Sequence, residues 1–220
     1  MRDSEARADR QPDFDADFRA RLAELVRWRR DVRRFRRDPV PPAVIDRLLA
    51  LACQAPSVGL SQPWRFVLVE EAARRAAVRE NFLACNAEAL ADYSGARAAL
   101  YARLKLAGLD EAPVQLGVFC DEATTTGHGL GRKTMPETLR FSVVTAVHTL
   151  WLAARAWGIG VGWVSIIEPE AVARSLDVPD RWSLVAYLCI GYPLEERGAP
   201  ELEREGWESR QSLEGCLVRR

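Results

Sequence analysis

The longest apolar stretch of the chain, Val143 to Val164, constrains the fold more than any other feature. Its length exceeds the roughly 18 residues that suggest a membrane span. However, it contains His148, Arg155 and several glycines, which a lipid-facing helix would not tolerate well. A buried helix followed by a turn and a strand explains this mixture better. The stretch therefore predicts a packed core in which a helix leads directly into a strand.

The helical part of this stretch has its apolar residues on one face. The residues that share the face are Leu139, Val143, Val147, Leu150, Ala154 and Trp157. Spacings of three and four predict a helix over 137–157. The segment "GVGWVSI" that follows is rich in β-branched residues and predicts a strand, with Ser165 at its end.

Helices and strands alternate along the rest of the chain. The other predicted helices cover 14–29, 44–52, most of 71–110 with a break near 92–95, and a short segment after Pro169. The other predicted strands are 64–70, 114–122 and 182–193. The order contains no regular βαβ repeat. It therefore predicts an α+β sandwich with a mixed central sheet flanked by helices.

Composition excludes several classes of protein. The 220 residues fit one domain, and Lys+Arg and Asp+Glu are both 31, so no net charge draws the chain to nucleic acid or to an acidic membrane. The polar N-terminus has no signal-peptide core, and residues 1–13 are expected to be flexible. The five cysteines are widely spaced and are expected to be reduced core residues of a cytoplasmic protein. The two histidines are far apart in the sequence, so no zinc site is expected.

The run "RRDVRRFRRD" (29–38) has six arginines in ten positions. It is typical of a solvated helix end, of a nucleic-acid surface, or of a pocket for one phosphate, which guanidinium groups bind in bidentate geometry. Trp28 and Phe35 lie at core-like spacing, which disfavours the nucleic-acid interpretation. Asp31 sits inside the run, where neighbouring arginines favour its ionised form. A structural ion pair and a proton acceptor both remain open for it.

A second motif, "APSVGLSQPWRF" (55–66), ends a helix at Pro56 and continues through a Ser/Gly turn into a strand. Small residues at such a turn let the backbone approach a flat ligand closely.

Two familiar functional motifs are not matched by this sequence. "GHGLG" (127–131) does not match G-x-G-x-x-G, so 123–136 is expected to be a surface or lid loop. "GWVSI" lacks the nucleophile elbow of serine hydrolases, so Ser165 is expected to hydrogen-bond a ligand instead.

Together, "RRDVRRF", "APSVGLSQPWRF", "GVGWVS" and "GYP" resemble the nitroreductase superfamily of FMN proteins, over nearly the whole chain from about residue 15. The similarity is greatest to its 5,6-dimethylbenzimidazole synthase branch, because Asp31 replaces a usual serine and Leu60 replaces an asparagine of many reductases. By resemblance, Arg29, Arg30 and Arg33 hold the FMN phosphate, with Arg210 as a fourth ligand. The resemblance also implies an FMN site that includes Asp31, Val32, Pro56, Ser57, Leu60, Trp163, Val164 and Ser165.

The branch fragments reduced FMN with molecular oxygen into 5,6-dimethylbenzimidazole and erythrose 4-phosphate, for the lower ligand of cobalamin. FMN is then a substrate, with Asp31 as a general base at the ribityl side and Ser165 as a hydrogen-bonding or proton-shuttling group at the ring. The resemblance further implies a nitroreductase-like flavin domain over 14–220 that forms a homodimer with FMN at the subunit interface. The domain includes a lid (about 85–109) and a C-terminal tail that embraces the partner (about 194–220). A separate flavin reductase is expected to supply reduced FMN.

Two alternatives stay open. An NAD(P)H-dependent FMN reductase would act on nitro compounds, enones or halogenated aromatics, but Asp31 and Leu60 disfavour it. A non-catalytic flavin carrier or sensor would bind FMN without chemistry, and no fused signalling domain supports that interpretation.

Overall fold

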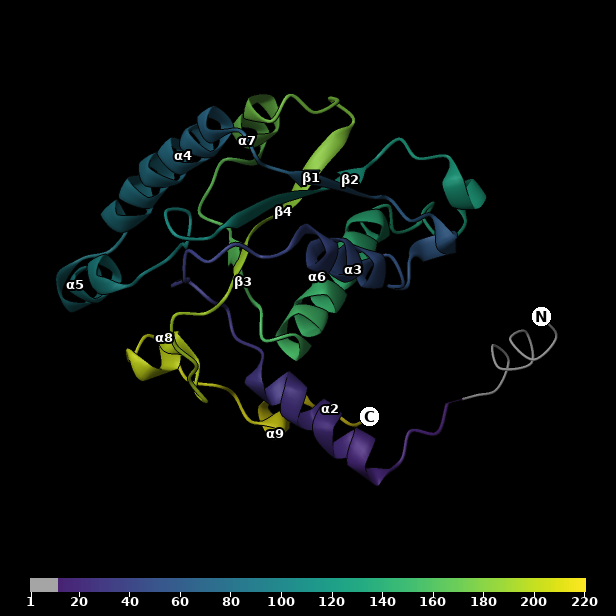
Figure 1. Cartoon of the computed structure of the whole chain (residues 1–220), viewed down its shortest axis with the longest axis horizontal. Helices are drawn as coiled ribbons and strands as arrows, with labels where there is room; N and C mark the ends of the chain where they lie inside the picture. The colour runs from purple at the N-terminus through teal and green to yellow at the C-terminus, as the bar shows by residue number, and fades with distance from the viewer. Residues whose placement is uncertain (1–11) are drawn as a thin grey trace.

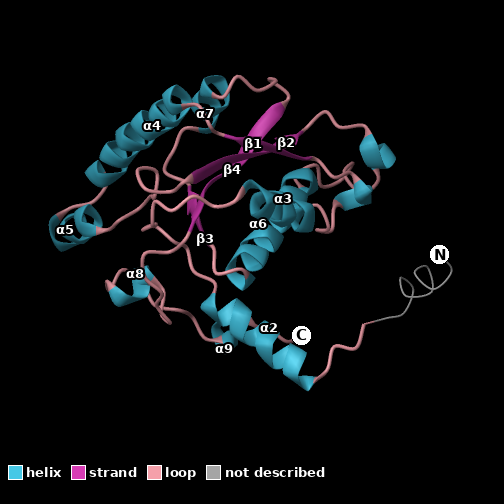
Figure 2. Cartoon of the chain, viewed as in Figure 1, coloured by secondary structure: helices cyan, strands magenta, loops and turns pink. Residues whose placement is uncertain are grey.

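The computed structural model describes residues 12–220, so the predicted flexible N-terminus lies almost entirely outside the described residues. A four-stranded sheet forms the centre, in the order β1-β2-β4-β3, and all its strand pairs are antiparallel (Figure 2). The strands are β1 (Trp64–Leu68), β2 (Val114–Asp121), β3 (Gly160–Val164) and β4 (Trp182–Gly191). Among residues 12–220, the parallel pairing is an isolated bridge between Asp31 and Val161. The sheet is thus antiparallel and not mixed as predicted, because this bridge lies outside its four strands.

Helices cover both faces of the sheet, which confirms the predicted α+β sandwich (Figure 1). One face carries α3 (Pro42–Ala52) and α6 (Thr138–Ala156), and the other carries α4 (Ala72–Ala91) and α7 (Pro169–Ser175). After a break at 92–94, α5 (Gly95–Arg103) follows α4. The remaining helices are α2 (Ala16–Trp28), α8 (Glu201–Arg204) and α9 (Leu213–Cys216). In the view of Figure 1 these three lie below the sheet, and α2 contacts α6.

The apolar face predicted for α6 is buried. Leu139, Val143, Leu150 and their neighbours on that face are at most 4% exposed. The exception is Trp157, which is 44% exposed because the helix ends at Ala156 and Trp157 is its cap. Burial of such aliphatic side chains stabilises the fold by about 1.5–3 kcal/mol each. Helix α6 is therefore a central element of the hydrophobic core.

Helix α2 does not bury the apolar face that its sequence predicts. It has no buried residue, and Phe18 and Leu22 are 39% and 44% exposed. This face lines a groove of about 620 Å³ together with Leu25 and Trp28. The amphipathic pattern is correct, but the described part of the chain leaves its apolar side open.

The cysteines divide into two groups. Cys120 and Cys189 are buried and Cys85 is half-buried, whereas Cys53 and Cys216 are exposed. The expectation of core residues is thus wrong for the last two, because Cys53 caps α3 and Cys216 belongs to the short tail helix α9. Within residues 12–220, no cluster of three potential metal ligands occurs. No helix in this part is long and apolar enough to cross a membrane.

Candidate functional site

The arginine segment leaves the end of α2 and runs along edge strand β3. The Val32 amide donates a hydrogen bond to the Val161 carbonyl at 3.0 Å. This approach requires glycine in β3, since a Cβ on Gly162 would lie 2.0 Å from the Val32 carbonyl oxygen. A Cβ on Gly160 would lie 2.7 Å from the Val32 side chain. The G-x-G pattern of the strand thus places the arginine segment on the sheet edge.

The Asp31 carboxylate is held by two donors. Its Oδ1 accepts a hydrogen bond from the Trp163 backbone amide at 2.9 Å, and its Oδ2 accepts one from Arg33 Nε at 2.8 Å. The ion pair with Arg33, one of the two roles left open by the sequence, is therefore present. The Asp31 side chain remains 31% exposed. An ionised carboxylate has about four acceptor sites, so capacity for a further hydrogen bond remains.

Four arginines gather around one small cavity next to this carboxylate. The cavity has a volume of about 130 Å³ and is lined by Arg29, Arg30, Asp31, Arg33, Pro200, Glu201, Leu202 and Arg210. A cavity of this size has room for a small anion such as a phosphate group. The tail residue Arg210 and the three arginines of the first motif therefore line the same cavity. This cavity is called the arginine pocket below.

The charge balance of the arginine pocket favours an anion. Burial lowers the pKa of Arg30, and the like charges of Arg210, Arg29 and Arg155 lower it further. Burial likewise lowers the pKa of Arg29, where Asp31 opposes the shift and Arg210 adds to it. The buried Nε of Arg30 has no hydrogen-bond partner within residues 12–220. A dianion would accept such bonds and relieve the repulsion, so these residues fit the phosphate of FMN.

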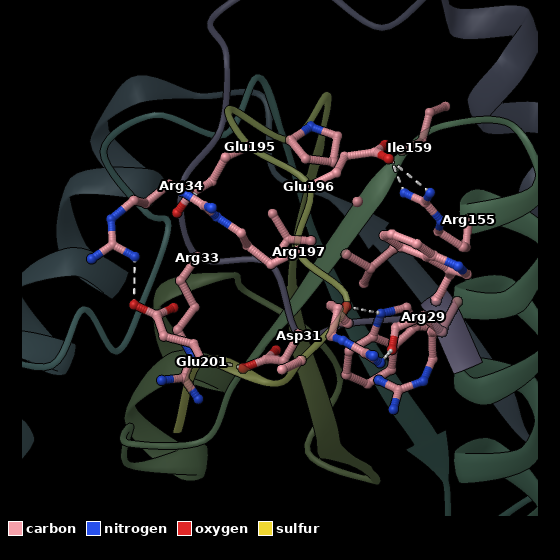
Figure 3. A pocket seen from close by; sticks show the side chains of 18 of the residues that line it. Arg29, Asp31, Arg33, Arg34, Arg155, Ile159, Glu195, Glu196, Arg197 and Glu201 are labelled. Atoms are coloured by element: carbon pink, nitrogen blue, oxygen red, sulfur yellow. Dashed lines mark hydrogen bonds and ion pairs between the residues drawn. The ribbon is translucent and has the colours of Figure 1, made fainter. Parts of the chain in front are cut away.

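Helix α6 and the tail hold the arginines in place. The guanidinium carbon of Arg29 lies 4.7 Å from the centre of the Trp151 ring, and Trp151 Nε1 donates to the Arg30 carbonyl at 3.0 Å. Arg155 forms a two-pronged ion pair with Glu196 at 2.8 and 3.0 Å (Figure 3). No sequence motif pointed to Trp151, Arg155 or the tail carboxylates. A charged residue within an apolar helix was the one available sign for Arg155.

The end of β3 lies against the same segment. Asp31 is bonded to the amide of Trp163, and Ser165 follows two residues later, at roughly 7 Å along an extended strand. Val164 between them is buried, whereas Ser165 is exposed. The structure thus brings the two predicted catalytic residues, Asp31 and Ser165, to one edge of the sheet.

The second motif lies elsewhere. The Pro56 carbonyl accepts a hydrogen bond from Thr145 at 2.9 Å, and the Val58 amide donates one to Ser142 at 3.0 Å. Ser142 precedes Trp151 by nine residues of α6, or about 13 Å along the helix axis. Pro56 and Ser57 therefore sit at the opposite end of α6 from the arginine pocket. Their neighbour Leu60 is 70% exposed, and one chain does not bring these three residues onto the pocket.

The described features define an α+β sandwich that carries an anion pocket and a fixed carboxylate at one sheet edge. The nitroreductase family model matches residues 26–192, so the chain belongs to the nitroreductase family. It is 61% identical to the 5,6-dimethylbenzimidazole synthase of Rhodospirillum rubrum over 200 residues, 91% of this chain and 95% of that protein. A 5,6-dimethylbenzimidazole synthase of Rhodobacter capsulatus is 51% identical over 89% of this chain and 94% of its own.

A solved structure supports the same assignment. An iodotyrosine deiodinase bound to FMN and 3-iodo-L-tyrosine superposes with a TM-score of 0.71 at 25% identity. The match covers 90% of this chain and 97% of the deiodinase. The nitroreductase-like fold predicted from the motifs is thus confirmed.

Proposed function

We propose that the chain is a 5,6-dimethylbenzimidazole synthase that fragments reduced FMN with molecular oxygen into 5,6-dimethylbenzimidazole and erythrose 4-phosphate. The observation that carries this function is the arginine pocket with the Asp31 carboxylate fixed on its wall. The 61% and 51% identity to proteins of that name supports the choice of reaction. A reductase acting on nitro compounds is less favoured.

In the proposed complex, Arg29, Arg30, Arg33 and Arg210 bind the FMN phosphate. Bound at this pocket, the reduced flavin supplies the electrons for the reaction with oxygen. A phosphate at the pocket places the adjoining ribityl chain beside Asp31, which lines the same cavity. Asp31 then acts as general base toward a ribityl proton, a role that carboxylates fill when a proton donor lies within hydrogen-bond reach. Ser165, exposed at the end of β3, hydrogen-bonds or shuttles a proton at the ring side.

The site is completed by a second copy of the chain. Pro56, Ser57 and Leu60 lie at the far end of α6 from the arginine pocket of their own chain, so a second copy would supply them to the flavin ring. The open apolar face of α2 offers surface for such a homodimer. Residues 14–220 form one flavin domain in this proposal, with a lid at about 85–109 and a tail at about 194–220 that embraces the partner.

The proposed reaction requires a supply of reduced FMN and a reducing compartment. Reduced FMN has to come from a separate flavin reductase, because the chemistry consumes the flavin and cannot regenerate it. The proposed location is the cytoplasm, where reduced flavin and reduced thiols are available.

The test is to mix the protein with FMN reduced without air, admit oxygen, and separate the products. Formation of 5,6-dimethylbenzimidazole with loss of flavin supports the proposal. Full recovery of oxidised FMN, together with steady NADPH turnover on a nitroaromatic compound, contradicts it and favours the reductase.

A further inference from the structure

A tryptophan of the C-terminal tail packs against the segment proposed as the lid. The half-buried Trp207 ring lies edge-on to Tyr93, with ring centres 5.4 Å apart and planes at 82°, and 6.0 Å from the ring of Tyr101. The guanidinium carbon of Arg97 lies 4.7 Å from the centre of the Trp207 ring. Arg97 also donates a hydrogen bond to the Trp207 carbonyl at 3.0 Å. These four residues are called the Trp207 clasp.

The lid side of the clasp is firmly anchored. The rings of Tyr93 and Tyr101 stack with centres 5.0 Å apart. Tyr101 is only 6% exposed, and its hydroxyl donates to Asn86 Oδ1 of α4 at 2.9 Å. The clasp therefore reaches α5, the turn before it and the end of α4 at once. Movement of the tail at Trp207 would therefore also displace the lid segment.

The tail side is fixed by the end of α8. The Trp207 amide donates to the Leu202 carbonyl at 2.8 Å, and the Gly206 amide donates to the Glu203 carbonyl at 3.2 Å. Gly206 has a φ of +73°, in the left-handed region. These two bonds form a Schellman motif, which turns the chain sharply after a helix. The turn directs Trp207 toward α5.

Helix α8 also connects to the arginine segment and the pocket. Glu201 in α8 pairs with Arg34 of the arginine segment (Figure 3). Three residues after Trp207, Arg210 lines the arginine pocket. The tail between Glu201 and Arg210 thus joins the proposed phosphate site at both ends and touches the lid in the middle.

We propose that Trp207 is a positioning residue that couples a phosphate monoester in the arginine pocket to closure of residues 92–103, the central part of the lid. The inference rests on the proposed function for the identity of its ligand, FMN. Without an anion, repulsion among the arginines loosens Arg210 and the tail. With phosphate bound, Arg210 is held and the clasp draws α5 closed. Aromatic and cation–π contacts of this kind correspond to a change of about tenfold in the closed-to-open ratio.

Hydrogen exchange of the full-length chain tests this coupling. Exchange of amides 93–103 is measured without ligand, with saturating oxidised FMN, and with riboflavin, which lacks the phosphate. We expect FMN to slow this exchange about tenfold in the parent and in Trp207→Phe, and riboflavin to have little effect. In Trp207→Ala the protection by FMN is expected to be lost. Glu208→Gln, an exposed neighbour in the same tail, is the matched control and is expected to behave like the parent.

Saturation is checked by flavin fluorescence, and exchange in β2 and β4 checks that each variant is folded. Equal protection of 93–103 by FMN in the parent and in Trp207→Ala would overturn the coupling. Absence of protection in the parent would overturn it as well. Product formation from reduced FMN is measured on the same preparations. Its absence in the parent would contradict the synthase function and leave the exchange result as an independent statement about the lid.

Discussion

The Trp163 backbone amide donates a hydrogen bond to the Asp31 carboxylate at 2.9 Å, across a distance of 132 residues in the chain. A backbone amide in a sheet moves little, so this bond fixes the direction of the carboxylate without relying on a flexible side chain. The second bond, from Arg33 at 2.8 Å, ties the same carboxylate to a phosphate-binding arginine. The proposed base and the proposed anion site therefore share one rigid edge of the sheet.

Replacing Asp31 separates the two roles that the carboxylate could have. Asp31→Asn keeps an oxygen for the Trp163 amide but cannot take up a proton at neutral pH. We expect the rate of product formation to fall about 10²–10⁴-fold, the range for loss of a general base. FMN affinity is expected to stay the same or to tighten, since a negative charge beside the arginine pocket is removed. Single-turnover product formation measures the rate, and a fluorescence titration measures the affinity for FMN. Parent rates in both Asp31→Asn and Asp31→Ser would contradict the base role.

Removing one pocket arginine tests phosphate recognition. Arg30→Ala deletes a charged donor whose Nε is buried and unpaired within residues 12–220. Hydrogen bonds to charged groups contribute about 1.5–3 kcal/mol, so the FMN dissociation constant is expected to rise roughly 10- to 150-fold. Riboflavin binding is expected to change little. The matched control is Arg37→Ala, in the same segment but exposed and away from the pocket. An equal loss for FMN and riboflavin would show that Arg30 does not recognise phosphate.

The Gly162→Ala substitution tests the contact between β3 and the arginine segment. A methyl group in Gly162→Ala would lie 2.0 Å from the Val32 carbonyl oxygen, so the segment has to move away from the sheet. Overpacking of this kind costs about 1–3 kcal/mol in the free energy of unfolding, measured by urea denaturation. FMN affinity is expected to fall as well, because the displaced segment carries the pocket. Gly215→Ala, which meets no atom within 4 Å, is the control and is expected to change stability by less than about 0.5 kcal/mol. Equal stability of the two variants would contradict the packing.

The cysteines predict a pattern of chemical labelling. Burial raises the pKa of both Cys120 and Cys189 to about 12. Their thiols should not react with a disulfide reagent at pH 8, because the thiolate is the reactive form. Cys53 and Cys216 are exposed and are expected to react quickly. The labelled cysteines are counted before and after unfolding, and each is located from the masses of its peptides. Rapid labelling of Cys189 in the folded protein would contradict the described core.

The sequence predicted most elements of the fold because hydrophobic periodicity controls them locally. The buried face of α6 and the break between α4 and α5 were both expected, and the structure confirms them. Strand pairing was harder, since antiparallel order depends on contacts between distant segments that no local pattern encodes. The open side of α2 was also missed, because periodicity shows which residues share a face and not what covers that face.

Only part of the candidate site could likewise be predicted from the sequence. The resemblance to the nitroreductase superfamily implied that Arg29, Arg30, Arg33 and Arg210 would gather at one phosphate, and all four line one cavity. It could not give the orientation of Asp31, which depends on the register between the arginine segment and β3. Nor could it find Trp151, whose indole bonds the Arg30 carbonyl from a helix more than 100 residues away. Such contacts follow from the tertiary packing of α6 against the segment.

The most direct test of the central claim is the balance of products from reduced FMN. The protein is mixed without air with a known amount of reduced FMN, oxygen is admitted, and remaining flavin, 5,6-dimethylbenzimidazole and erythrose 4-phosphate are quantified. We predict that each flavin lost yields one benzimidazole and one erythrose 4-phosphate, and that oxidised FMN or exclusion of oxygen yields neither. Complete recovery of the flavin as oxidised FMN, with no benzimidazole, would contradict the account.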